Sequence, residues 1–194
     1  MAAPAREPSF DILGTLNRPW TAELALDLLP ENTGPKVEVF RGSVIVTPHA
    51  GYDHQMAERE LPYRLHRAAR RAGMWAYPEC NIVSGDDLFI PDFAVLRRSG
   101  AGKVYMPIAD AVLLGEITSP GNARKDVIDR PVEYAAAGVP FYLRVDFRDR
   151  VPALTLHELD GGAYRPVVTA VDNTFAMRQP FAFEIDPGEL VDEG

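Results

Sequence analysis

Two acidic residues lie in segments where an acid is not needed for solubility. Asp92 follows Pro91 within a strand-like segment, and Glu116 lies near the end of another, both among apolar neighbours. Because burying an unpaired carboxylate is costly, two such acids in a sheet indicate a bound cation or another charged partner. A metal ion satisfies both acids at once, although acids that cap turns at strand ends would give the same spacing.

The chemistry open to this pair follows from its ligand atoms. Carboxylate oxygens suit Mg²⁺ or Mn²⁺, which keep several waters and are commonly held by a few carboxylates together with substrate phosphates. An ion held in this way activates water and neutralises the charge that develops on a leaving oxygen. Asp92 and Glu116 therefore predict metal-assisted hydrolysis of a phosphodiester.

The elements in front of the two acids are predicted to include a short helix and a hairpin. The helix is expected over 22–29, after an N-capping threonine and before a proline. β-branched residues on both sides of Arg41-Gly42, a turn-like pair, predict a hairpin over 36–47. Glu38 lies inside the first strand of this hairpin, where it is either a site residue or an ion-pair partner of Arg41.

The segment 53–72 is predicted to be an amphipathic helix. Its apolar residues recur every three or four positions, and His54 falls on the same inward stripe. His54 is therefore either a site residue or a hydrogen-bonded core histidine. Arg64, Arg67 and Arg71 recur along one face of the helix and form either a surface for nucleic-acid phosphates or a solvated face.

Strand-like segments dominate the rest of the chain. They cover 75–83, 88–97, 111–117, 141–146, 153–158, 164–169 and 174–185. A helix ending at Gly138 separates the third segment from the fourth, and such a strand–helix–strand unit normally gives parallel neighbours in one sheet. The pattern predicts an α/β fold, with a mixed sheet flanked by helices. We expect one domain over 1–194, with a core over about 21–146 and a strand-rich C-terminal extension over about 151–186.

The order of the motifs resembles a known family. The motifs are Glu38 before a glycine turn, His54, Pro91-Asp92, Glu116-Ile117-Thr118-Ser119-Pro120, Asp126, Tyr134, Ala137-Gly138-Val139-Pro140 and Val145-Asp146. In this combination they resemble the Uma-two (Uma2) family, whose members belong to the restriction-endonuclease-like superfamily. The resemblance implies a nuclease with a restriction-endonuclease-like core. It also implies that Asp92 and Glu116 bind the metal and that Glu38 and His54 are further catalytic residues.

One departure from the superfamily pattern concerns its lysine. The position two after Glu116 is Thr118, and in the Uma-two family the lysine comes from the following helix, where this chain has Arg130. Arginine keeps the positive charge but does not lose a proton at working pH, so Arg130 is predicted to stabilise charge rather than to act as a base. Lys125 is a second candidate for this role, and Tyr134 is predicted to be a core residue.

Composition sets limits on the partners and the compartment. The net charge of −8 is unfavourable for a protein that holds DNA, but five of these charges lie in the last twelve residues, and the rest of the chain carries −3. The N-terminal residues lack the apolar run of a signal peptide, and no apolar stretch approaches the roughly 20 residues that span a bilayer. With the single Cys80 as a packing residue, we expect a cytoplasmic protein.

These observations combine into one interpretation with two rivals. Asp92, Glu116 and the carbonyl of Ile117 are predicted to hold Mg²⁺ (or Mn²⁺) in an endonuclease that cleaves DNA, with Arg130 in place of the usual lysine. A homodimer is compatible with the pattern. The first rival is a member that has lost or weakened cleavage and binds nucleic acid or a partner. The second is an interaction protein whose acids only cap turns.

Overall fold

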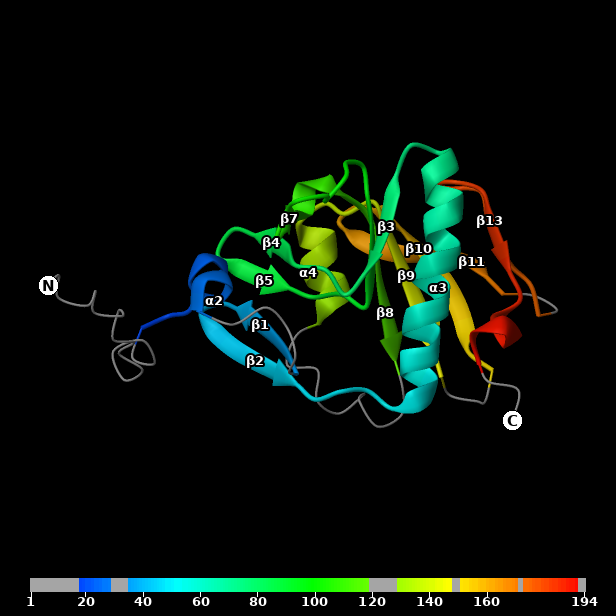
Figure 1. The fold of residues 1–194 in the computed structure, drawn as a ribbon. Helices are drawn as coiled ribbons and strands as arrows, with labels where there is room; N and C mark the ends of the chain where they lie inside the picture. The colour runs from blue at the N-terminus through cyan, green and yellow to red at the C-terminus, as the bar shows by residue number, and fades with distance from the viewer. Residues whose placement is uncertain (1–17, 29–34, 119–128, 148–150, 171–172, 192–194) are drawn as a thin grey trace, which may run out of the picture.

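The computed structural model describes residues 18–28, 35–118, 129–147, 151–170 and 173–191. In these residues the chain forms helices packed on three β-sheets (Figure 1). The elements in chain order are α2 (Ala22–Leu28), β1 (Lys36–Phe40), β2 (Ser43–Thr47), α3 (Tyr52–Arg71), β3 (Trp75–Pro78), β4 (Ile82–Ser84), β5 (Asp87–Phe89), β6 (Phe93–Leu96), β7 (Met106–Pro107), η1 (Ile108–Asp110), β8 (Ala111–Thr118), α4 (Arg130–Ala136), β9 (Phe141–Asp146), β10 (Ala153–Asp160), β11 (Ala163–Thr169), β12 (Phe175–Met177), β13 (Phe183–Ile185) and η2 (Pro187–Leu190).

The central six-stranded sheet has the strand order β11-β10-β9-β8-β6-β3. β8 and β9 are parallel, as the strand–helix–strand pattern predicts, and the other pairs in this sheet are antiparallel. The sheet is therefore mixed, which confirms the predicted architecture. β10 and β11 extend this sheet, so the expected C-terminal extension shares the hydrogen bonding of the central sheet.

The two faces of the central sheet carry different layers. α3 packs across one face through an apolar stripe that includes Leu61 and Leu65, and the segment from β12 to η2 adds Phe175 and Leu190 to the same cluster. α4 packs on the other face through Tyr134, in a cluster that also contains residues of the second sheet. Figure 1 shows α3 lying along the sheet and the second sheet projecting beside it.

The second sheet, of order β2-β1-β5-β4-β7, begins with the predicted hairpin. Arg41 and Gly42 both adopt positive φ, 49° and 78°, which is the geometry of a two-residue hairpin turn that matches the twist of its strands. The hairpin holds Lys36 and Glu38 on β1.

The predicted cap of the first helix, α2, is also present. The Thr21 hydroxyl accepts a hydrogen bond of 3.2 Å from the Leu24 backbone N–H, which confirms this prediction.

The predicted strand over 88–97 was wrong, because it is two strands in different sheets. β5 pairs with β1 and β4, whereas β6 pairs with β3 and β8. The break falls at Pro91-Asp92, where proline supplies no N–H to continue the ladder. Asp92 therefore lies at the junction of the two sheets. The segment 75–83 divides similarly, into β3 and β4.

A close contact between two strands of the central sheet lies beside Glu116. Gly115 on β8 lies opposite Phe93 on β6, and a Cβ at Gly115 would lie 2.0 Å from the Phe93 ring. This position therefore requires glycine, one residue before Glu116.

Of the helices in the described ranges, none combines the length and the hydropathy required to span a membrane.

Candidate active site

Asp92 is the centre of the site, and its two carboxylate oxygens have different partners. Oδ2 accepts a 2.7 Å hydrogen bond from the Ile117 backbone N–H and lies 3.4 Å from His54 Nε2. Oδ1 accepts a hydrogen bond from the ammonium of Lys36. Burial alone would raise the pKa of Asp92, but the hydrogen bond from His54 and the charge of Lys36 lower it to about 2. Asp92 is therefore an anion, although its side chain is only 5% exposed.

His54 and Glu58 reach Asp92 from the first half of α3. They are four residues apart, so they share one face of the helix. One ligand atom from each of His54, Glu58 and Asp92 lies within 4.8 Å of the other two. Burial raises the pKa of Glu58 to about 7 despite the nearby Lys36 charge. Burial would lower the pKa of His54, but its contact with Asp92 raises it.

Lys36, the first residue of β1, brings a cation to these acids. Its Nζ lies 3.5 Å from Glu58 Oε1 and 3.0 Å from Glu79 Oε1, in addition to its contact with Asp92. Burial alone would lower the pKa of Lys36, but Asp92 and the other two acids raise it above its ordinary value. We refer to Lys36, His54, Glu58, Glu79 and Asp92 as the Lys36 cluster.

Glu116 faces a second set of partners. Its Oε1 accepts a 2.6 Å hydrogen bond from the Tyr134 hydroxyl and lies 3.7 Å from Arg130 Nη1. Tyr134 and Arg130 are four residues apart on α4 and so face Glu116 together. Burial, together with the neighbouring Asp92 carboxylate, raises the pKa of Glu116 to about 8 against the opposing charge of Arg130. The acid therefore takes up or releases a proton near neutral pH.

Glu38 holds Arg130 by a two-point ion pair. Arg130 Nη1 donates to Glu38 Oε1 at 2.6 Å, and Nη2 donates to Oε2. Glu38 Oε1 also accepts a 2.7 Å hydrogen bond from the Ile90 backbone N–H, and the Glu38 side chain is fully buried. Arg41, the alternative partner, pairs instead with Glu133. We refer to Glu38, Glu116, Arg130 and Tyr134 as the Arg130 cluster.

The two clusters are joined by the pairing of β6 with β8. Because Phe93 is opposite Gly115, the preceding Asp92 and the following Glu116 lie at adjacent positions on the two strands. Residues opposite one another in an antiparallel pair project to the same side. The structure thus brings together all four predicted acids and bases, Asp92, Glu116, Glu38 and His54, with Arg130.

The predicted ligand set differs in detail from the arrangement in the structure. The three residues gathered for a cation are His54, Glu58 and Asp92, the only such group among the described residues. Glu116 is turned toward Tyr134, and the contact from Ile117 to Asp92 is made by its N–H group. Lys125 lies outside the described residues.

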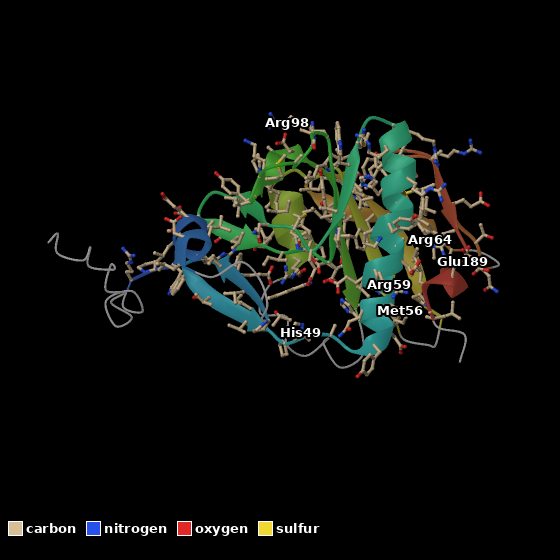
Figure 2. All side chains as sticks on the ribbon, in the orientation of Figure 1. His49, Met56, Arg59, Arg64, Arg98 and Glu189 are labelled. Atoms are coloured by element: carbon tan, nitrogen blue, oxygen red, sulfur yellow. The ribbon has the colours of Figure 1, made fainter. Side chains whose placement is uncertain are left out.

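The arginines proposed for DNA contact lie farther along α3. Arg64 donates a 2.6 Å hydrogen bond to Glu189, near the C-terminus, and also lies 3.8 Å from Glu60. Figure 2 shows Arg64 and Glu189 facing each other between α3 and the terminal segment. Arg67 and Arg71 are exposed. Of the three predicted arginines, Arg64 is the nearest to Glu58 along α3, and it is already engaged by an acid.

Sequence reasoning did not identify three members of the Lys36 cluster, namely Lys36, Glu58 and Glu79. Glu58 carried a signal, because it follows His54 by four residues on an amphipathic helix. Lys36 and Glu79 carried none, because their approach depends on how the two sheets meet. Arg144 on β9 was also not identified; it pairs in register with Glu116, and its side chain is 41% exposed.

The Lys36 cluster fits a divalent metal ion. One imidazole and two carboxylates are a donor set that Mn²⁺ accepts, and carboxylate oxygens also suit Mg²⁺. His54 contacts Asp92 through Nε2, whereas its buried Nδ1 has no hydrogen-bond partner among the described residues, so no structural hydrogen bond holds that nitrogen. The fit is to an ion that shares Asp92, Glu58 and His54.

Comparisons with known proteins give a family and a fold. The model of the Uma2 family, described as a putative restriction endonuclease, matches residues 22–187. A search of curated proteins finds no match. One solved structure, described as a putative nuclease belonging to DUF820 from Anabaena variabilis ATCC 29413, is similar at a TM-score of 0.67 and 18% identity, over 89% of this chain and 97% of that one. At this identity the likeness shows a shared fold.

Proposed function

Since this chain belongs to the Uma2 family, we propose that it is a metal-dependent nuclease that hydrolyses phosphodiester bonds in DNA. The observation that carries the proposal is the convergence of His54, Glu58 and Asp92 beside Glu116. Three ligand atoms within 4.8 Å of one another suit one divalent ion, and a third acid, Glu116, whose pKa is raised to about 8, lies next to them. Such a combination supplies both a Lewis-acid site and a group that exchanges protons.

The protein's own side chains divide the work of such a reaction. When bound, the ion would activate water and neutralise charge on the phosphate. Asp92 would be its central ligand, with His54 and Glu58 on one side, and the Ile117 N–H would fix the orientation of the Asp92 carboxylate. Glu116, the other metal-binding acid that the family resemblance implies, would be the third carboxylate at the metal, beside Asp92 and Glu58.

The Arg130 cluster would set the charge of Glu116. Arg130 favours the ionised form of Glu116, and the Tyr134 hydroxyl fixes its Oε1. A divalent ion bound at Asp92 would lower the pKa of Glu116 from its raised value, because an adjacent positive charge favours the ionised carboxylate. Arg130 would then act by position and charge, as predicted for an arginine that replaces a lysine.

Phosphate contacts would come from cations at the edge of the site. Arg144 lies beside Glu116 in the parallel pair β8–β9 and is more exposed than Arg130. It donates a 2.6 Å hydrogen bond to Asp146, so a phosphate would compete with that acid for its guanidinium. Arg67 and Arg71 are exposed on α3, about 13 Å or more along the helix from Glu58 at 1.5 Å per residue. These positions would engage neighbouring phosphates of one duplex rather than the phosphate that is cleaved.

A second candidate function is nucleic-acid binding with weak or no cleavage. The two-point pairing of Arg130 with Glu38 favours it, because an arginine saturated by a buried carboxylate has fewer donors left for a phosphate. In that case the fold and the basic surface would remain, and Mg²⁺- or Mn²⁺-dependent nicking would be absent.

The test is a plasmid-nicking assay on the full chain with Mg²⁺ or Mn²⁺. Wild type should nick DNA only with the ion, and Asp92→Asn should remove the activity, since the substitution keeps the side-chain shape but removes the charge. Asp160→Asn is a matched control, because Asp160 is an exposed acid on the β10–β11 hairpin. Equal nicking by Asp92→Asn and wild type would refute the proposed site. Binding of DNA without nicking would support the second candidate.

A further inference from the structure

Lys36 occupies the position from which a metal ion would approach Asp92. Of the two Asp92 oxygens, Oδ2 is already used by the Ile117 N–H and by His54. Oδ1, the oxygen left for a cation, is bonded to the Lys36 ammonium. The same ammonium lies 3.5 Å from Glu58, a second member of the metal-binding group. The lysine and a metal ion would therefore use the same oxygens.

The acids around Lys36 differ in their relation to that group. Asp92 and Glu58 belong to it, and their side chains are 5% and 17% exposed. Glu79, 3.0 Å from Lys36 Nζ, lies outside the group and is more exposed, at 36%. A dication on Asp92 and Glu58 would repel the ammonium, and Glu79 offers it a partner nearer to solvent. The flexible four-carbon stem of lysine permits such a displacement.

We propose that Lys36 is a displaceable cation of the site: it neutralises Asp92 and Glu58 until a divalent ion takes these oxygens, and it then moves with Glu79 to the rim. The proposal rests on the proposed function, because it assigns the working ion to His54, Glu58 and Asp92. It gives Lys36 a positioning role, since the ammonium contacts Asp92 and Glu58 together, favours their charged forms and holds them close to each other before the ion arrives.

The first experiment measures Mn²⁺ affinity by calorimetry on the full chain. Lys36→Met removes the competing charge and keeps most of the stem, so the affinity should rise by about 10-fold or more. Lys103→Met is the control, because Lys103 lies exposed in the turn before β7. The Mn²⁺ affinity of this variant should match that of wild type. An unchanged or weaker affinity in folded Lys36→Met would overturn the proposal.

The second experiment uses the wild-type chain and so does not depend on the folding of a variant. Lysine acetylation is followed by mass spectrometry with and without Mn²⁺. The modification rate of Lys36 should rise several-fold on addition of the ion, relative to Lys103, because its amine leaves a buried pair for a more exposed one. A rate that is unchanged or reduced contradicts displacement.

The two outcomes separate this proposal from the proposed function. If Lys36 is displaced by Mn²⁺ and wild type does not nick DNA, the lysine inference stands and the nuclease assignment fails. If wild type nicks DNA with Mn²⁺ and both lysine measurements are negative, the nuclease assignment stands and the lysine inference fails.

Discussion

The Lys36 cluster and the Arg130 cluster contain similar groups but differ in how completely those groups are paired. In the Arg130 cluster, the planar guanidinium meets fully buried Glu38 at two points, and the remaining acid is bonded to a tyrosine. In the Lys36 cluster, one ammonium is shared among three acids, and His54 Nδ1 has no partner in the described part of the chain. The first arrangement is suited to fixing geometry and the second to exchanging one cation for another.

The largest effect is expected on breaking the Arg130 cluster. Arg130→Ala leaves Glu38 buried without its cation, which should lower the free energy of unfolding by about 3–5 kcal/mol. Any cleavage should fall by about 10²-fold or more, since one electrostatic donor is lost. Denaturant unfolding and single-turnover nicking measure the two effects.

Two further variants separate the roles of Arg130. Arg130→Lys should alter the nicking rate only modestly if the cation acts through charge. The double variant Glu38→Gln/Arg130→Gln should recover part of the stability without recovering cleavage, because the buried charge is gone. Nicking by Arg130→Ala at the wild-type rate would remove Arg130 from the site and direct the search to Lys125.

A smaller loss is expected at the joint between the clusters. Gly115→Ala would place a methyl group against the Phe93 ring, and such overpacking typically costs about 1–3 kcal/mol of unfolding free energy. Asp92 directly precedes Phe93 and Glu116 directly follows Gly115, so a displacement of these two strands should also lower the Mn²⁺ affinity. Gly85→Ala is the comparison, because its turn has a positive φ but no neighbour within 4 Å of the added carbon. Gly85→Ala should lower stability without changing the affinity.

The Lys36 cluster should respond to a neutral substitution by changing metal affinity more than stability. Glu58→Gln removes the charge of one metal ligand. Burial raises the pKa of the Glu58 carboxyl to about 7. Mn²⁺ affinity should fall by about 10-fold or more, and the unfolding free energy should change by less than about 1 kcal/mol. Calorimetry and denaturant unfolding test the two parts. A large loss of stability with unchanged affinity would make Glu58 a structural residue.

The metal-free protein should become less stable as the pH rises from about 5 to about 8. Glu58 and Glu116 have pKa values of about 7 and 8 in the folded protein, above the ordinary value of 4.5. Below 4.5 both states are protonated; at higher pH the unfolded chain releases protons that the folded protein retains, so the unfolding free energy falls until the folded pKa is passed. The raised pKa of His54 acts in the same direction.

Thermal unfolding measures this dependence. The Tm of the metal-free protein should be lower by about 3 °C or more near pH 8.5 than near pH 5.5. The lowered pKa of Asp92 has its effect only below about pH 4 and does not enter this range. Mn²⁺ should reduce the difference, and so should Glu58→Gln/Glu116→Gln. A Tm that rises over this range in the metal-free protein contradicts the raised values.

The smallest effect is expected on the exposed face of α3. Because Arg64 is bound by Glu189, only Arg67 and Arg71 of the predicted set are exposed. Changing both to Glu should weaken DNA binding equally for different sequences and lower the salt slope by roughly 1 for each lost phosphate contact. Fluorescence anisotropy at several salt concentrations measures the slope, and an unchanged slope makes these arginines a solvated face.

The sequence by itself determined some of the local elements, although not the breaks within 75–83 and 88–97, and the residues that carry the family motif. The turn-like pair Arg41-Gly42 predicts the hairpin, the periodicity of apolar residues predicts α3, and the order of the motifs identifies Asp92 and Glu116. These features depend on neighbours in the chain, so single-sequence reasoning reaches them. The family match over 22–187 confirms the resemblance.

Only the tertiary structure decided which partner each charge meets. A carboxylate in a strand shows the same pattern whether it faces Arg41 or Arg130, and only the position of α4 in the fold brings Arg130 within hydrogen-bond distance of Glu38. The break at Pro91 places Asp92 at the junction of two sheets, where Lys36 from β1 and His54 from α3 contact its two different carboxylate oxygens. The energy of an ion pair depends on the distance between its charges to within a few ångströms. Here the two charges come from segments far apart in the sequence, and no local sequence pattern encodes the distance between them.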